Sequence, residues 1–158
     1  MVKTTTLSEI RKELEDKSNR ELMEYCLRLA RFKKENKELL SFLVFDANDV
    51  SSHIENVRNE IISSFDQINN THVYYLKKSI RKILRQVNKH IRIIGERHAE
   101  AELLIQFCIS LYAFPGNVVK HKQILKLYET NLGKAEKALS YLHPDLQYDL
   151  KKQLHADS

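Results

Sequence analysis

The sequence predicts an all-α protein in which about seven to eight helices form a compact multi-helix bundle or a short superhelical stack. Its 158 residues include only three glycines and two prolines, so few positions interrupt regular structure. Leu, Lys, Glu and Ala, which favour helices, are frequent, and apolar residues recur at helical spacing. Because this length suits one domain, we expect residues 1–158 to form a single all-α domain.

The N-terminal part of the sequence predicts three helices, near residues 7–16, 19–34 and 37–46. Thr6 with Glu9, and Ser18 with Glu21, each form a capping-box pattern before an apolar run. Asn36 is expected to be the N-cap of the third helix. The second and third helices are apolar around most of their circumference, which is typical of helices at the centre of a packed array.

The middle of the sequence predicts two one-sided helices that pack as an antiparallel hairpin. The first spans about 49–68 and has an apolar stripe with steps of three and four residues. The second spans about 72–94 and has a stripe of the same kind. Residues 69–71 are too few for anything but a tight connection between them. Gly95 is expected to end the second helix as its C′ residue.

Three further helices are expected in the remaining residues, near 97–114, 117–142 and 144–154. The first is apolar all round and ends at Pro115 and Gly116. Gly133 is a weak point inside the second, and Pro144 opens the last. Leucines at steps of four make this last helix narrow and amphipathic, so it either covers the core or packs on a second subunit.

The net charge of +5 is distributed unevenly along the chain. Residues 73–126 hold 11 basic and three acidic side chains, and the helix predicted over 73–94 holds no acidic residue at all. At 100° per residue, six cations of this helix share one side, which we call the cationic row: Lys78, Arg81, Lys82, Arg85, Lys89 and Arg92. Tyr74 has the same helical angle as Arg92.

Like charges three or four residues apart cost a few tenths of a kcal/mol each unless negative charge lies against them. One interpretation is that the cationic row lies along a nucleic-acid backbone, with Tyr74 stacking beside it, or faces an acidic protein surface. The alternative is that acidic residues of the same chain neutralise the row, or that water alone does. The acidic candidates are Glu55, Glu60, Asp66, Glu96, Glu100 and Glu102.

Other motifs give no prediction of a catalytic residue, a metal site or a cofactor. The sequence has no glycine-rich phosphate loop and no nucleophile elbow. His98 with Glu102, and Asp49 with His53, share helix faces, and surface pairing is the expected role of both pairs. Cys26 and Cys108 lie in apolar patterns, so we expect two buried, unreactive thiols, with a single disulfide as the alternative.

Three classes of function therefore remain, and we rank a non-enzymatic interaction module that presents the helix 73–94 to an acidic protein or nucleic acid first. A structural subunit of a homo-oligomer is second. An enzyme or small-molecule binder with a site between central helices is third. The first 14 residues have no hydrophobic segment typical of a secretory signal, and the most apolar run, 101–114, is too short to span a bilayer. We expect a cytoplasmic protein with no membrane partner.

Two stretches of the sequence carry a family resemblance. Residues 22–47 read LMEYCLRLARFKKENKELLSFLVFDA, and residues 68–92 read INNTHVYYLKKSIRKILRQVNKHIR. They resemble a family of uncharacterised helical proteins from Bacteroidetes-type bacteria, with the similarity covering about residues 7–114. The resemblance implies an all-α cytoplasmic bacterial protein and supplies no activity, cofactor or site.

Overall fold

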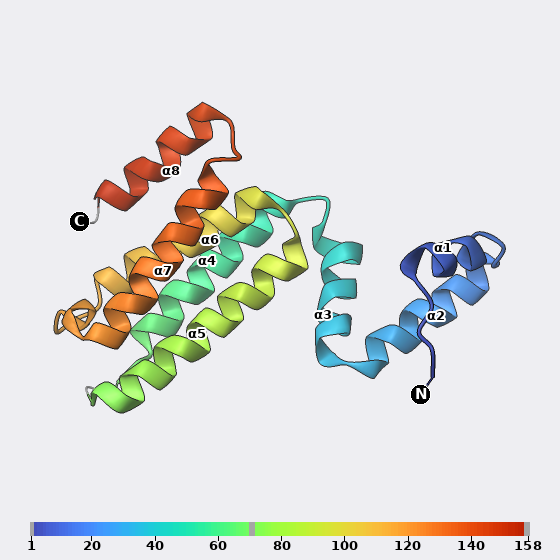
Figure 1. Ribbon diagram of the computed structural model, residues 1–158, viewed down its shortest axis with the longest axis horizontal. Helices are drawn as coiled ribbons and strands as arrows, with labels where there is room; N and C mark the ends of the chain where they lie inside the picture. The colour runs from blue at the N-terminus through green and yellow to red at the C-terminus, as the bar shows by residue number, and fades with distance from the viewer. Residues whose placement is uncertain (1, 70–71, 157–158) are drawn as a thin grey trace. The chain divides into compact units, whose positions relative to one another are not determined.

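The computed structural model describes residues 2–69 and 72–156, and within them the fold is all-α, as the sequence predicts (Figure 1). These residues form eight α-helices, one π-helical turn and one 3₁₀ turn, without a strand. In chain order the elements are α1 (Leu7–Glu15), α2 (Asn19–Phe32), α3 (Lys34–Ser41), the π-turn η1 (Phe42–Asp46), α4 (Val50–Asp66), α5 (Val73–Ile94), α6 (Arg97–Tyr112), the 3₁₀ turn η2 (Val118–Lys120), α7 (Lys122–Leu139) and α8 (Pro144–Ala156).

The helices belong to two compact units, Met1–Asp46 and Ala47–Ser158, where the sequence predicted a single domain. The N-terminal unit holds α1, α2, α3 and η1, and the C-terminal unit holds α4 to α8. None of the described helices is long and apolar enough to cross a membrane.

The N-terminal unit begins its first two helices with the predicted capping boxes. The Thr6 and Ser18 hydroxyls accept hydrogen bonds from the backbone N–H groups of Glu9 and Glu21, at 3.3 and 3.2 Å, and the glutamates accept bonds in return. The prediction that Asn36 caps the third helix is wrong. The helix begins one turn earlier, and the Asn36 amide donates instead to the carbonyl of Leu29 on α2, at 2.8 Å.

The prediction that the second and third helices lie at the centre of a packed array is also wrong. Neither α2 nor α3 contains a buried residue, and Cys26 is exposed where a buried thiol was expected. Apolar circumference shows how much of a helix could be buried, but burial requires neighbours on each side. Within the N-terminal unit, α2 packs on α3, which covers one side of each.

The C-terminal unit is organised around α6, whose apolar residues surround the helix as the sequence predicts. Helix α6 packs against α4, α5, α7 and α8 and has buried side chains on every side. The Phe107 ring, which is fully buried, lies 5.7 Å from the ring of Phe65 on α4. Leu150 of α8 is buried, and α8 contacts α6, so the last helix covers the core of its own chain.

Helices α4 and α5 are adjacent and form the predicted hairpin (Figure 1). Each buries one stripe: Ile54, Val57, Ile61 and Phe65 on α4, and Leu76, Ile80, Ile83, Val87 and Ile94 on α5. Gly95 ends α5 with a φ of 72°, a left-handed conformation that glycine adopts without steric cost. Of the predicted connection, Asn70 and Thr71 lie outside the described residues.

Candidate anion-binding surface on helix α5

The cationic row owes its direction to the buried stripe of α5. The stripe residues repeat every three or four positions, so they face the core along the length of the helix. Ile80 has no exposed surface and Val87 has 1%. This stripe fixes the rotation of α5 about its own axis and directs the row away from the core. The orientation therefore follows from hydrophobic burial and needs no ion pair to maintain it.

The structure places five of the six cations of the row on the surface. Lys78, Arg81, Lys82, Arg85 and Arg92 are exposed. Lys89 is half-buried and interacts with another residue, so it differs from the other five cations of the row. The seventh basic residue of α5, Lys77, lies off the row, and its ammonium donates to the side-chain carbonyl of Gln123 on α7.

The acidic residues that could have neutralised the row are mostly engaged elsewhere. Four of the six candidates form ion pairs within the C-terminal unit: Glu55 with Arg58 at 3.2 Å, Glu60 with His90 at 3.6 Å, Glu100 with Arg97 at 3.5 Å and Glu102 with His98 at 2.7 Å. No described carboxylate of this unit lies within salt-bridge distance of Arg81, Lys82, Arg85 or Arg92. Arg81, Lys82 and Arg85, which are neighbours on the helix, therefore repel one another without compensation inside the unit.

Aromatic side chains lie at the N-terminal end of the row. Tyr74 is half exposed, and the Lys78 ammonium lies 4.7 Å from the centre of its ring. The Tyr75 ring meets Tyr74 edge to face at 5.3 Å, and the His72 ring meets Tyr75 at 5.8 Å. Tyr74 lies beside the row, as its helical angle predicts, but the cation that contacts its ring is Lys78 and not Arg92. The exposed ring faces are of the kind on which nucleobases stack.

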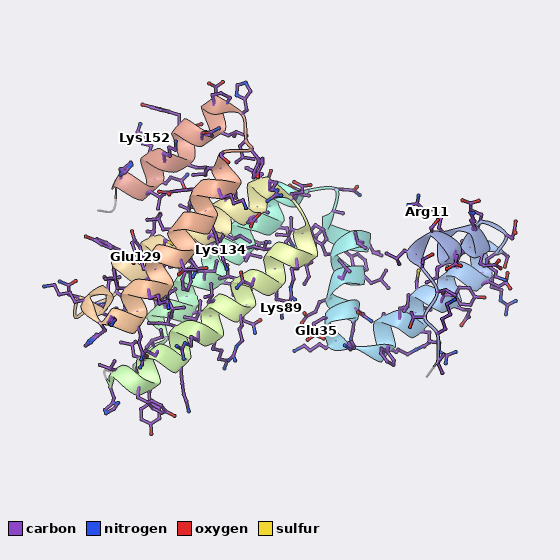
Figure 2. The ribbon with its side chains drawn as sticks, viewed as in Figure 1. Arg11, Glu35, Lys89, Glu129, Lys134 and Lys152 are labelled. Atoms are coloured by element: carbon purple, nitrogen blue, oxygen red, sulfur yellow. The ribbon has the colours of Figure 1, made fainter. Side chains whose placement is uncertain are left out.

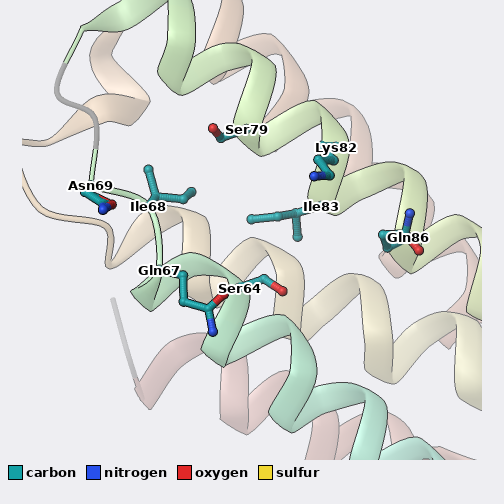
Figure 3. A pocket seen from close by; sticks show the side chains of 8 residues that line it. All are labelled: Ser64, Gln67, Ile68, Asn69, Ser79, Lys82, Ile83 and Gln86. Carbon is teal, nitrogen blue, oxygen red and sulfur yellow. The ribbon is translucent and has the colours of Figure 1, made fainter.

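A pocket of about 530 Å³ adjoins the row between the end of α4 and the middle of α5 (Figure 3). Ile68 and Ile83 point toward one another across it. The remaining lining is polar and contains one cation and no carboxylate: Ser64, Gln67, Asn69, Ser79, Lys82 and Gln86. Hydroxyl and amide groups can donate to phosphate and sugar oxygens, and Lys82 belongs both to this pocket and to the row.

The pocket residues were missed by reasoning from the sequence, although part of the signal is visible there. Ser79 and Gln86 are seven residues apart, which is two helical turns, so they flank Ile83 on one side of α5. Ser64 and Gln67 lie on α4 and its C-cap. Only the packing of α4 against α5 brings the two sets together, and sequence spacing does not give that packing register.

The other pairs singled out in the sequence behave as surface groups. His98 and Glu102 form the expected i,i+4 pair. Asp49 is the N-cap of α4, where its carboxylate accepts from the Ser52 backbone N–H at 3.1 Å and from its hydroxyl at 2.7 Å. These bonds to the Ser52 side chain and backbone hold the pKa of Asp49 below its ordinary value.

The two thiols have opposite environments. Cys26 is exposed on α2, whereas Cys108 is buried in α6 as expected. Burial, together with the smaller effect of the nearby charge of Glu136, raises the pKa of the Cys108 thiol to about 12. Cys108 is therefore protonated at neutral pH and is an unreactive core thiol.

The chain was also compared with models of protein families, with curated proteins and with solved structures. None of these comparisons finds a match. The resemblance of residues 7–114 to a bacterial family stays a prediction, and the interpretation of the surface rests on its geometry.

Proposed function

We propose that the protein is a non-enzymatic, cytoplasmic interaction module that binds the phosphate backbone of a nucleic acid along the cationic row of α5. The observation that carries the proposal is the exposed set Arg81, Lys82, Arg85 and Arg92, which has no carboxylate within salt-bridge distance in the described part of its unit. Arginine and lysine in such a row neutralise phosphates and release counterions, which supplies sequence-independent affinity.

The surroundings of the row support nucleic acid over an acidic protein surface. The exposed rings of Tyr74 and Tyr75 offer stacking faces at one end. The pocket beside Lys82 offers amide and hydroxyl groups that suit phosphate and sugar oxygens. Carboxylates of an acidic protein would use the cations and could accept from the donors of the pocket, but they would leave the stacking faces unused. An acidic protein surface is the second candidate, because the row itself fits either partner.

The proposal is tested by charge reversal on the row. The triple variant Arg81→Glu, Lys82→Glu and Arg85→Glu should bind a fluorescent 20-nucleotide single strand or 20-base-pair duplex at least about a hundredfold more weakly than the unchanged protein. The matched control is the triple variant Lys134→Glu, Lys137→Glu and Lys152→Glu, which changes the net charge equally at exposed lysines of α7 and α8 (Figure 2). We expect the control to retain binding.

The salt dependence identifies the partner. The logarithm of affinity for duplex DNA should fall against the logarithm of salt concentration with a slope of about −0.9 for each phosphate contacted, or about −3.6 for four contacts. A flat salt response, or equal loss of binding in both triple variants, would contradict the proposal. Tighter binding to polyglutamate than to either nucleic acid would favour the acidic protein surface.

A further inference from the structure

Tyr74 and Tyr75, which we call the tyrosine pair, lie at the start of α5 on or beside the cationic row. Tyr74 is 52% exposed and Tyr75 is 53% exposed. At 100° per residue, Tyr74 has the same angle as Arg92, and Tyr75 lies within about 20° of Lys82. Both rings therefore accompany the cations and point away from the buried stripe of the helix.

The first turns of α5 hold the tyrosine pair in a defined position. Leu76, which follows the pair, is only 2% exposed and packs in the core. The Tyr74 backbone N–H donates to Nδ1 of His72 at 3.4 Å. The Lys77 ammonium donates to the side-chain carbonyl of Gln123 on α7. Because the core and α7 fix this end of the helix, the two rings are presented to a ligand with little backbone freedom to lose.

The start of α7 adds positive charge at this end of α5. Gln123, the partner of Lys77, follows Lys122 directly, and Lys126 lies one turn further along. Lys120, Lys122 and Lys126 are exposed, and residues 103–128 contain no aspartate or glutamate. A strand that passes the tyrosine pair therefore meets cations on α7 as well as on the row.

Stacking on the tyrosine pair requires unpaired bases. In a duplex the flat faces of the bases are covered by neighbouring base pairs, so a protein reaches only phosphates, sugars and base edges. In a single strand the bases can be splayed out and stacked on aromatic side chains. Each stacked base strengthens binding by roughly five- to 150-fold. The exposed rings thus add affinity for a single strand that a duplex does not gain.

The pocket beside Lys82 also suits a base better than a phosphate alone. Asn69 and Gln86 line it with side-chain amides, which both donate and accept, as the edges of bases do. Phosphate oxygens only accept. Ile68 and Ile83 point toward one another across the pocket, so they offer apolar contacts to the faces of a flat ring (Figure 3). A base that is paired and stacked within a duplex does not reach these groups.

We infer that the protein selects single-stranded over double-stranded nucleic acid, with unpaired bases on the tyrosine pair and in the pocket while the backbone follows the row. The inference rests on the proposed function, because it requires the row to bind phosphates. Electrostatics alone predicts the opposite order, since a duplex has the higher density of phosphate charge. Tighter binding of the single strand is therefore a measure of the contacts with bases.

Three probes test the inference with the unchanged full-length protein. They are a 20-nucleotide thymidine strand, a 20-base-pair duplex, and a strand with the same number of phosphates in which stable abasic sugars replace the nucleosides. In about 150 mM salt, the thymidine strand should bind at least about tenfold more tightly than either of the other probes. Equal or tighter binding of the duplex, or equal binding of the abasic strand, would overturn the inference.

Substitution of the tyrosine pair locates the selectivity. The double variant Tyr74→Leu and Tyr75→Leu should bind the thymidine strand at least about tenfold more weakly and the other two probes within about twofold of the unchanged protein. Tyr74→Phe with Tyr75→Phe keeps both rings and should retain the selectivity. Tyr141→Leu with Tyr148→Leu is the matched control, because it removes two exposed tyrosines elsewhere in the same unit. Equal losses on all three probes in the first variant would show a structural role and contradict the inference.

Charge reversal on the row separates this inference from the proposed function. The triple variant Arg81→Glu, Lys82→Glu and Arg85→Glu should weaken binding of all three probes, because each carries phosphates. If it does so while the duplex binds as tightly as the thymidine strand to the unchanged protein, the selectivity is overturned and the proposed function stands. If the unchanged protein binds none of the probes, both are overturned.

Discussion

Arg58 of α4 donates two hydrogen bonds to the side-chain carbonyl oxygen of Gln106 on α6, at 3.2 Å from Nη2 and 3.4 Å from Nε. Gln106 is only 6% exposed, and its amide nitrogen donates to the Ser110 hydroxyl at 3.1 Å. Glu55 accepts a further bond from the same guanidinium, at 3.2 Å. The contact between α4 and α6 thus combines apolar packing with a polar connection whose geometry fixes how the two helices align.

Replacement of Gln106 by leucine should lower the free energy of unfolding by about 1–2 kcal/mol, because the partly buried Arg58 guanidinium loses its acceptor. Urea unfolding followed by circular dichroism measures the change. Gln86→Leu is the matched control at an exposed glutamine of α5, and it should change stability by less than about 0.5 kcal/mol. Equal effects in the two variants would show that the Arg58 bonds do not stabilise the unit.

Replacement of Arg85 by glutamine should raise the free energy of unfolding by a few tenths of a kcal/mol at low salt. Arg85 is one turn from Arg81 and has no ion pair within the described part of its unit, so the substitution relieves repulsion. Thermal or urea unfolding in about 20 mM and 500 mM salt should show the gain shrinking as salt rises. Arg58→Gln is the contrast, since it removes a partnered cation and should destabilise. A loss of stability in Arg85→Gln would reveal a structural role for that residue.

Replacement of Ser18 by alanine should raise the pKa of Glu21 toward 4.5 and weaken the start of α2 by about 1 kcal/mol. Hydrogen bonds from the Ser18 backbone N–H and hydroxyl hold this pKa below 4.5 in the unchanged protein. Because the folded pKa is lowered, the stabilisation is present above about pH 4.5 and is lost as pH falls through the folded value. Carboxyl NMR titration measures the pKa.

Glu9 provides the internal control for that experiment. It occupies the equivalent position in the capping box of α1, where bonds from Thr6 lower its pKa. Its titration should be the same in the Ser18→Ala variant and in the unchanged protein. A Glu21 pKa that also stays the same would contradict a contribution from the Ser18 hydroxyl.

Stability should fall as pH rises above 9 because of Cys108. In the unfolded chain the thiol ionises near its ordinary pKa of 9.0, whereas burial raises the folded pKa to about 12. The folded state therefore keeps a proton that the unfolded state loses, so the loss grows between these two values. Urea unfolding at about pH 8 and pH 10.5 should show a smaller decrease for Cys108→Ala than for the unchanged protein.

Tyr128 contributes in the same direction, since burial is the main cause of its raised pKa and the neighbouring Cys108 raises it further. The difference between Cys108→Ala and the unchanged protein therefore reports the thiol together with its effect on Tyr128. Cys26→Ala is the matched control, because Cys26 is exposed and its replacement should leave the pH dependence intact. A decrease of the same size in Cys108→Ala would mean that the thiol does not couple to folding.

The local features of the fold were predictable because short-range chemistry determines them. Both capping boxes and the glycine end of α5 follow from neighbouring residues alone. The helix predicted over 117–142 is shorter in the structure, where α7 spans Lys122–Leu139. Asn117 has a left-handed φ of 54°, and the 3₁₀ turn η2 occupies the next three residues. Gly133 does not interrupt α7.

The long-range features could not be obtained in this way. The apolar circumferences of α2 and α6 look alike in sequence, but α6 is surrounded by four helices and α2 has no buried residue. The number of neighbours depends on tertiary packing, which periodicity does not contain. The same limit applies to the candidate surface, where the six cations were predictable but the engagement of Lys89 and the pocket beside Lys82 were not.

The central position of α6 also determines the order in which the C-terminal unit can be completed during synthesis. Helices α4 and α5 leave the ribosome before α6, so their apolar stripes stay partly uncovered until α6 has been synthesised. A nascent chain arrested before residue 97 therefore lacks the helix that covers these stripes, and its exposed apolar surface makes it prone to aggregation. Because four helices pack on α6, displacement of α6 uncovers all of them. The C-terminal unit should therefore unfold in a single cooperative transition.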